Sequence, residues 1–217
     1  YFSKDGSVAE EITFSGGKRD GRSTVWLTPE EKQEEKFYKN GKLDGPSTFW
    51  ENGYRSTMTT YKSDSPEGPW VIWFSNSDQI KEQGFHQKGI REGLTTYYYE
   101  DGTMQREGFF KEGLPDGMWT YWNKEGEKDF DFDFGSGLQH ISLEDLVERE
   151  STFYKLGEDT PFTGIITQEN PEADYLFLGR TKGGKKDGQW VKWFPSGKDV
   201  PEIILVDVPD PEPVLPW

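Results

Sequence analysis

The sequence predicts an all-β fold: an elongated array of about seven β-hairpin repeats of about 24 residues, forming a single-layer twisted antiparallel sheet. Three observations predict it. Glycines that follow an acidic residue recur at a regular spacing, aromatic residues recur at fixed distances from those glycines, and hairpin turn dipeptides lie between them. Such a sheet has no central globular core, which fits a chain of 217 residues with 32% hydrophobic but 16% aromatic residues.

Six of the glycines that follow an acidic residue define the repeat. The first five are separated by 24, 23, 25 and 24 residues, and the last gap of 71 residues is close to three periods. Thr163-Gly164 lies 24 residues before the last of these glycines and marks a further repeat. We call the six the marker glycines: Gly21, Gly45, Gly68, Gly93, Gly117 and Gly188.

Aromatic residues keep register with the marker glycines, and eight of the nine Trp lie two or five residues after one. This regularity predicts that they hold neighbouring repeats together and makes them candidates for a partner-binding surface. The aromatic residues five positions after a marker are Trp26, Trp50, Trp73, Tyr98, Trp122 and Trp193, and those two positions after are Trp70, Trp119 and Trp190.

Each period is predicted to be a β-hairpin. Asn52-Gly53 is a two-residue turn sequence between a run that ends in aromatic residues and a return strand over residues 54–61. At the other end of the hairpins a second glycine lies four residues before the marker, and we interpret the acidic residue next to the marker as a turn former. These second glycines are Gly17, Gly41, Gly89, Gly113 and Gly184.

The repeat pattern is interrupted once, which predicts four parts: a first array over residues 1–134, a junction over 135–150, a second short array over 151–206 and a Pro-rich tail over 207–217. In the junction, Ser142 and Asp145 resemble a capping box and predict a short helix. The aliphatic run over 203–208 predicts a last strand or one added to a partner sheet. Leu215 and Trp217 are the predicted anchors of the tail, on the protein's own edge or on a partner.

Charge and cysteine content exclude several classes of function. The formal net charge of -15 argues against nucleic acid or an anionic membrane surface as a partner. The chain has no Cys, which excludes disulfides, thiolate zinc sites and Cys nucleophiles. No segment approaches a transmembrane span, so we expect no membrane insertion by this chain. It begins with Tyr1 and not Met, which is compatible with a preceding signal peptide or lipid-anchor segment.

No residue pattern predicts catalysis, a cofactor or a metal. Asp129, Asp131 and Asp133 superficially resemble a Ca²⁺ loop, but the glycine falls at position 7 and position 12 is His140, so a solvated strand face is the expectation. His86 and His140 are the only histidines, and neither has a nearby nucleophile and acid in the sequence. We therefore expect a protein that is not an enzyme.

Three segments resemble a known family. They are YKNGKLDGPSTFWENG at residues 38–53, FKEGLPDGMWTYWNKEG at 110–126 and TKGGKKDGQWVKWFPSG at 181–197. They look like the bacterial MORN-repeat variants, the YwqK-type antitoxin-like proteins, over residues 15–134 and 149–200. The segment over 146–166 resembles the start of an array in these proteins. The resemblance implies hairpin arrays used for protein binding, often in lipoproteins or exported proteins.

These observations predict a non-enzymatic protein-binding scaffold or accessory subunit, acidic and lipoprotein-like, in a bacterial cell-envelope assembly that is periplasmic or lipid-anchored. The expected partner is another protein, in a larger complex. The alternative is an antitoxin or immunity-type protein that covers the basic active site of a toxin, which the acidic charge allows. A polysaccharide hydrolase is a third hypothesis, but no two carboxylates are paired at a predictable distance.

Overall fold

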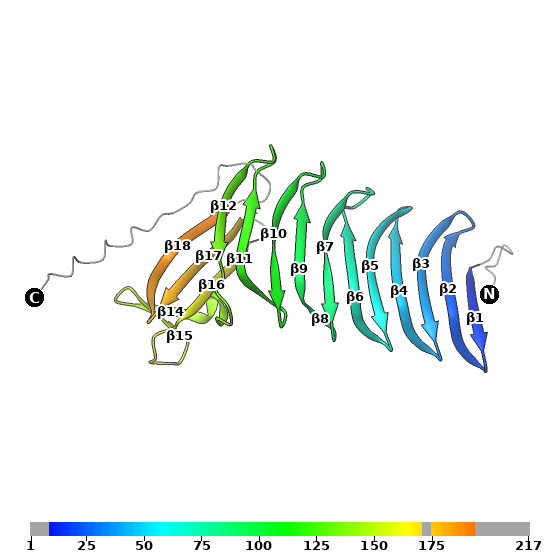
Figure 1. Ribbon diagram of the computed structural model, residues 1–217, viewed down its shortest axis with the longest axis horizontal. Helices are drawn as coiled ribbons and strands as arrows, with labels where there is room; N and C mark the ends of the chain where they lie inside the picture. The colour runs from blue at the N-terminus through cyan, green and yellow to red at the C-terminus, as the bar shows by residue number, and fades with distance from the viewer. Residues whose placement is uncertain (1–8, 171–174, 194–217) are drawn as a thin grey trace, which may run out of the picture. The chain divides into compact units, whose positions relative to one another are not determined.

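The computed structural model describes residues 9–170 and 175–193, and it confirms the all-β prediction (Figure 1). Strands make up 70% and helix 2% of the structure. Twelve strands form one long antiparallel sheet that is not closed, in the order β1-β2-β3-β4-β5-β6-β7-β9-β10-β11-β12, with β8 paired to β7. Neighbours in the sheet are therefore neighbours in the chain, as a hairpin array requires.

The strands of this sheet follow the predicted period. Their bounds are β1 Glu10–Ser15, β2 Lys18–Thr28, β3 Glu31–Lys39, β4 Lys42–Glu51, β5 Tyr54–Lys62, β6 Ser65–Trp73, β7 Ile80–Gln87, β8 Ile90–Arg91, β9 Gly93–Tyr98, β10 Met104–Lys111, β11 Leu114–Trp122 and β12 Lys128–Asp133.

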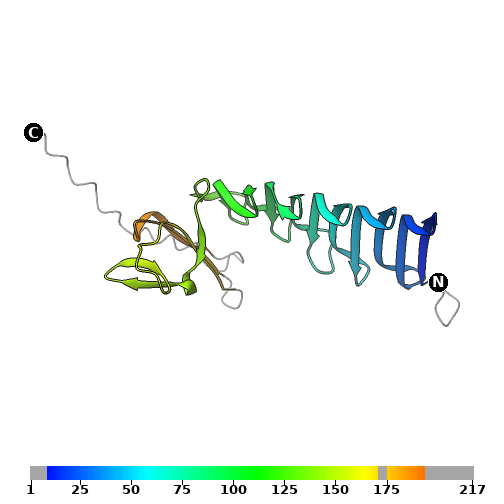
Figure 2. The ribbon, with the colours of Figure 1, turned by 90° about the horizontal axis from the view of Figure 1, so that it is seen from below.

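The chain divides into two compact units. The first comprises Tyr1–Pro115 and Thr120–Lys128, and the second comprises Asp116–Trp119 and Asp129–Trp217. Within the first unit the hairpins lie side by side in chain order, and Figure 2 shows them from below.

The turns explain why the glycine pattern repeats. At Asn40-Gly41 both residues have positive φ, 53° and 86°, and the same holds at Asn52-Gly53, with 53° and 81°. Positive φ at both central residues defines the type I′ turn, whose twist matches that of the flanking strands. Glycine adopts this conformation without steric cost, which is why it recurs at the second turn position.

The acidic residue before a marker glycine has a structural role that connects repeats. The Asp20 carboxylate accepts a hydrogen bond from the Asn40 backbone N–H of the next turn at 3.0 Å, and the Glu67 carboxylate accepts one from Lys88 N–H at 2.7 Å. Glu92 accepts one from Glu112 N–H at 2.9 Å. Each carboxylate thus satisfies a turn N–H that the hairpin leaves without a backbone partner.

The second unit combines several small sheets. Its four-stranded sheet has the order β13-β16-β17-β18, and β13 runs parallel to β16, which hairpin repeats alone did not predict. A separate hairpin pairs β14 with β15. The bounds are β13 His140–Ser142, β14 Leu146–Arg149, β15 Thr152–Lys155, β16 Gly164–Asn170, β17 Tyr175–Lys182 and β18 Lys185–Trp193.

The predicted junction helix is a single 3₁₀ turn, η1, over Leu143–Asp145. The Ser142 hydroxyl caps it by accepting a hydrogen bond from Glu144 N–H. The tail with Leu215 and Trp217, and the aliphatic run over 203–208, lie outside the described residues. Of Trp193, the backbone in β18 is described but not the side chain.

Candidate functional site

Strand register divides the side chains of the first unit between two faces of its sheet. Trp70 pairs with Thr59 on β5 and with Gly84 on β7, so these positions share a face, which we call face A. Phe109 pairs with Leu94 and Phe85 pairs with Pro69, and these positions lie on the opposite face, which we call face B.

Face A holds the most buried line of the unit. The residue two positions after the marker is buried whether it is aromatic or small, as at Ser47, Trp70 and Thr95. The Trp70 ring extends over Gly84, where an added Cβ would lie 2.8 Å from the ring. Large and small residues therefore alternate across neighbouring strands on face A, and this lets a single layer of strands bury a Trp side chain.

Arginines pack among the aromatic rings of face A. The Arg91 guanidinium lies 4.5 Å from the Trp70 ring centre, bonds the Tyr97 hydroxyl at 2.9 Å and pairs with Glu82 at 3.3 Å. Burial raises the pKa of the Tyr97 hydroxyl despite the positive charge beside it. The guanidinium groups thus form part of the packing, and these contacts fix the orientation of Arg91.

His86 occupies a position on face A that other return strands fill with Tyr or Phe. It pairs with marker Gly68, as Tyr38 pairs with Gly21 and Phe110 with Gly93. Its Nδ1 atom is buried without a hydrogen-bond partner. Burial, and then the charge of Arg91, lower the pKa of the His86 imidazole. The geometry makes it a packing residue held in the neutral form.

The aromatic residues five positions after a marker whose side chains the structure describes are half-buried or, for Trp73, buried. Cations cover the faces of two of them: Lys32 lies 5.4 Å from the Trp50 ring centre and Arg55 lies 4.7 Å from the Trp73 ring centre. A sugar ring binds to an aromatic side chain whose face is open to solvent. These cation contacts therefore argue against a polysaccharide as the ligand of these residues. Trp50 and Trp73 thus pack within the repeat array.

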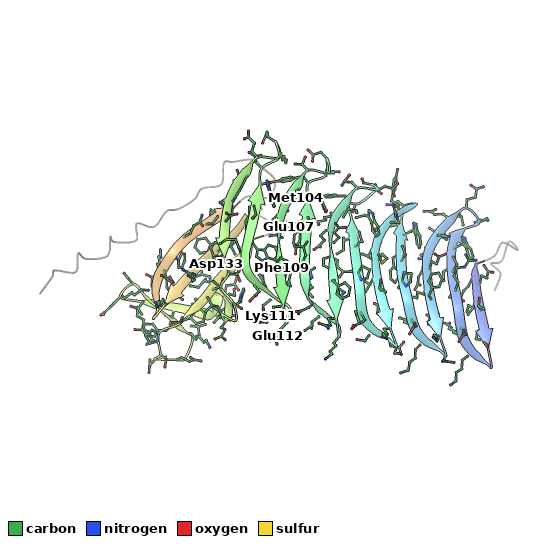
Figure 3. All side chains as sticks on the ribbon, viewed as in Figure 1. Met104, Glu107, Phe109, Lys111, Glu112 and Asp133 are labelled. Carbon is green, nitrogen blue, oxygen red and sulfur yellow. The ribbon has the colours of Figure 1, made fainter. Side chains whose placement is uncertain are left out.

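A group of exposed apolar side chains from neighbouring strands of the first unit lies on face B. We call it the apolar patch, and Figure 3 labels its residue Phe109 on β10, between Glu107 and Lys111. Its side chains come from strands β7 to β11 and stay 44 to 56% exposed. The patch comprises Phe85, Ile90, Leu94, Phe109 and Leu114.

The repeats themselves show that this exposure is unusual. The patch residues lie eight positions before, three before or one after a marker glycine. In the two repeats marked by Gly93 and Gly117 all three positions are apolar, whereas the repeats of the other four marker glycines place a charged or hydroxyl residue in at least one of them. The corresponding sets are Thr13, Lys18 and Arg22; Phe37, Lys42 and Pro46; Thr60, Ser65 and Pro69; and Arg180, Lys185 and Gln189. The repeat at Gly164 also has apolar residues at these positions, Leu156, Pro161 and Ile165, but Ile165 is fully buried there.

The second unit contains a polar pocket of about 210 Å³ beside the predicted carboxylate strand. As predicted, the aromatic and acidic residues of β12 alternate, with Phe130 and Phe132 buried and Asp133 exposed. Arg180 pairs with Asp187 at 3.1 Å and lies 3.7 Å from Asp133. Among the described residues, no group of three or more His, Asp or Glu is arranged to hold a metal. The pocket is lined by Met118, Asp131, Phe132, Asp133, Arg180, Asp187 and Gln189.

The net charge is unevenly distributed between the units. Residues 1–115 with 120–128 contain 21 Asp and Glu against 17 Lys and Arg, whereas 116–119 with 129–217 contain 19 against 8. Most of the negative charge thus belongs to the second unit, and the apolar patch lies in a nearly balanced one.

The predicted site residues do not gather in one place. Trp70, Trp119 and Trp190 are buried, so they stabilise the fold and present no surface. The remaining predicted aromatic residues whose side chains are described are half-buried or, at Trp73, buried. Sequence reasoning missed the patch because it sought what the repeats share. A comparison of what differs between repeats at the three positions identifies it.

Comparison with known proteins adds no identification: no protein-family model and no curated protein matches the chain. The similarity to MORN-repeat variants remains a prediction from the sequence motifs. Among residues 9–170 and 175–193, no helix is both long and apolar enough to span a bilayer.

Proposed function

We propose that this chain is a non-enzymatic protein-binding scaffold that binds through the apolar patch on face B. The observation that supports the proposal is the patch itself: five exposed apolar side chains occupy positions that other repeats share with charged and hydroxyl residues. Contiguous exposed apolar surface on a soluble domain is typical of protein interaction sites.

The chemistry of the patch fits the centre of a protein interface. Such centres are depleted of charged residues and enriched in aromatic ones, and they have a polar rim. Phe85 and Phe109 supply rigid aromatic surface, and Glu107 and Lys111 lie at the rim along β10. The rigid sheet presents these side chains without a large ordering cost on binding.

The proposal is tested by affinity capture from native extract with two matched variants. Phe109→Ser combined with Leu94→Ser removes the centre of the patch, and Leu27→Ser alters a residue of β2 that is 66% exposed and lies outside it. We expect bound proteins to be lost with the patch variant and retained with the Leu27 variant. Identical sets of bound proteins from both variants would contradict the proposal.

A second candidate function is an antitoxin that neutralises a basic toxin through the second unit. The second unit contains 19 acidic and 8 basic residues, which supports this candidate, because charge complementarity accelerates association with a basic protein. Rescue of growth on co-expression with a toxin encoded by a neighbouring gene tests this function. Rescue that persists in the patch variant would assign it to the second unit.

A further inference from the structure

We infer that the apolar patch is an isologous interface, in which face B of one copy packs against face B of a second copy of this chain. This inference rests on the proposed function, because it names the first partner of the same patch. The nearly balanced charge of the first unit permits two copies to approach through it, with 21 acidic against 17 basic residues.

The order of side chains along β10 supports self-pairing. Every second residue of β10 points to face B, and three of these are Glu107, Phe109 and Lys111. The aromatic residue thus lies between an acidic and a basic one. Successive residues on one face are about 6.6 Å apart. The arrangement is self-complementary under a two-fold rotation that reverses the strand.

Of the two two-fold axes that align β10 with β10 of the second copy, only one gives favourable contacts. An axis in the plane between the sheets and perpendicular to β10 places Phe109 opposite its own copy and Glu107 opposite Lys111 of the second copy. An axis parallel to β10 would place Glu107 opposite Glu107 of the second copy, and Lys111 likewise, which is repulsive. The favoured arrangement is the aligned face-to-face packing of two sheets, about 10 Å apart.

The charged residues at the rim are free to make these pairs. Lys111 is exposed, and within the part of the chain that the structure describes no carboxylate pairs with it. Glu107 accepts one hydrogen bond, from the Thr96 hydroxyl at 3.2 Å, and its carboxylate has further acceptor capacity. The central row of Phe85, Leu94 and Phe109 then packs against its own copies and excludes water.

The size of the patch predicts a weak dimer. The patch covers four strand positions, because β8 and β9 both pair with the same edge of β7. Four positions about 4.8 Å apart, over four residues of each, span about 19 Å by 13 Å, or about 250 Å² per copy. Stable interfaces bury about 800 Å² per partner. We therefore expect reversible association with a Kd of about 100 µM, visible only at high concentration.

Analytical ultracentrifugation of the full chain from about 10 µM to 1 mM tests the inference through charge reversal. Glu107→Lys and Lys111→Glu each oppose like charges across the two-fold axis, and we expect each variant alone to dimerise at least about tenfold more weakly. Mixing the two variants restores attraction on both sides of the axis, so the mixture is expected to dimerise as the wild type does. Circular dichroism checks that each variant is folded.

Three results would overturn the inference: a monomer throughout the concentration range, a dimer that the single reversals leave unchanged, or a mixture that stays monomeric while the wild type dimerises. The failure of the proposed function is separate, because it is measured by capture with the Phe109 and Leu94 variant. A monomer whose patch still captures a different protein would refute self-pairing and leave the scaffold intact, with that protein as the occupant.

Discussion

The first unit, Tyr1–Pro115 with Thr120–Lys128, and the second, Asp116–Trp119 with Asp129–Trp217, contain the same hairpin but bury their side chains differently. In the second unit aliphatic residues such as Ile165, Ile166 and Leu178 are at most 1% exposed. In the first unit, an aromatic side chain such as Trp70 is buried among its neighbours on face A. Phe109 and Leu94 on face B remain exposed. The same hairpin can therefore support either a closed core or an open sheet with an exposed apolar face.

The two units should differ most in how much stability they lose when a buried or half-buried isoleucine is replaced by alanine. Ile166→Ala should lower the free energy of unfolding by about 3 kcal/mol, because it leaves a cavity in a closed core that relaxes little. Ile72→Ala, at a half-buried position of β6, should cost about 1 kcal/mol. Urea denaturation measures both, and hydrogen exchange locates the loss. Equal losses would show that the first unit also has a closed core.

A second pair of variants adds volume beneath a Trp in each unit. A Cβ at Gly179 would overlap the Trp190 ring, and one at Gly84 would lie 2.7 Å from the Thr95 hydroxyl oxygen and 2.8 Å from the Trp70 ring. We expect Gly179→Ala to cost about 3 kcal/mol and Gly84→Ala about 1 kcal/mol, because the ring on the open sheet has room to shift. Thermal unfolding of the two variants measures both losses. A larger loss for Gly84→Ala than for Gly179→Ala would contradict the view that the first unit is the more open of the two.

The bonds between successive turns differ in charge between the units. Glu67 accepts from Lys88 N–H at 2.7 Å in the first unit, whereas the neutral Thr163 hydroxyl accepts from Gly183 N–H at 2.8 Å in the second. Glu67→Ala should therefore cost about 1.5 kcal/mol and Thr163→Ala about 1 kcal/mol in unfolding free energy. Glu67→Gln retains an acceptor and serves as the control. A gain in stability on removing Glu67 would disprove its turn role.

The first unit should also lose stability in mild acid through His86. Its folded-state pKa is lowered, so the unfolded chain binds the proton more readily, and stability falls as pH drops below about 6.5. His86→Phe, which matches Phe110 at the equivalent position, should remove this slope below about pH 6.5. Urea midpoints at several pH values measure it. An unchanged slope in the variant would assign the dependence to other groups.

The smallest effect on stability is expected in the apolar patch. Phe109→Ser changes a side chain that is 56% exposed, so the unfolding free energy should stay within about 0.5 kcal/mol of the wild type. Urea denaturation checks this. A loss of several kcal/mol would mean that the residue belongs to the core, and the patch would no longer qualify as a binding surface.

The repeat and its turns could be predicted from the sequence because they depend on local chemistry. Asn52-Gly53 forms the expected type I′ turn, with both residues at positive φ. The parallel pairing of β13 with β16 could not be predicted, because His140 and Ile165 are far apart in the chain and share no repeat position. The capping residue Ser142 was found, but the length of the helix depends on tertiary contacts.

Part of the candidate site was also within reach of the sequence. Phe109 and Leu94 stand out once each repeat is compared with the others at the same positions. Their exposure could not be predicted, since equally regular aromatic residues such as Trp70 and Trp119 are buried. The exposed or buried state of an aromatic residue depends on which face it occupies and on what lies beside it on the neighbouring strands.

The sequence by itself determined the all-β hairpin array and the position of the turns, because these follow from φ preferences and backbone hydrogen bonding within one period. It marked the acidic residues as turn formers, and the structure showed that they bond to the next turn. Tertiary structure decided which aromatic residues form the interior and which form a surface. The register places Trp70 over Gly84 on one face and leaves Phe109 exposed on the other. That outcome depends on side chains of neighbouring strands, which a periodic pattern along one strand does not specify.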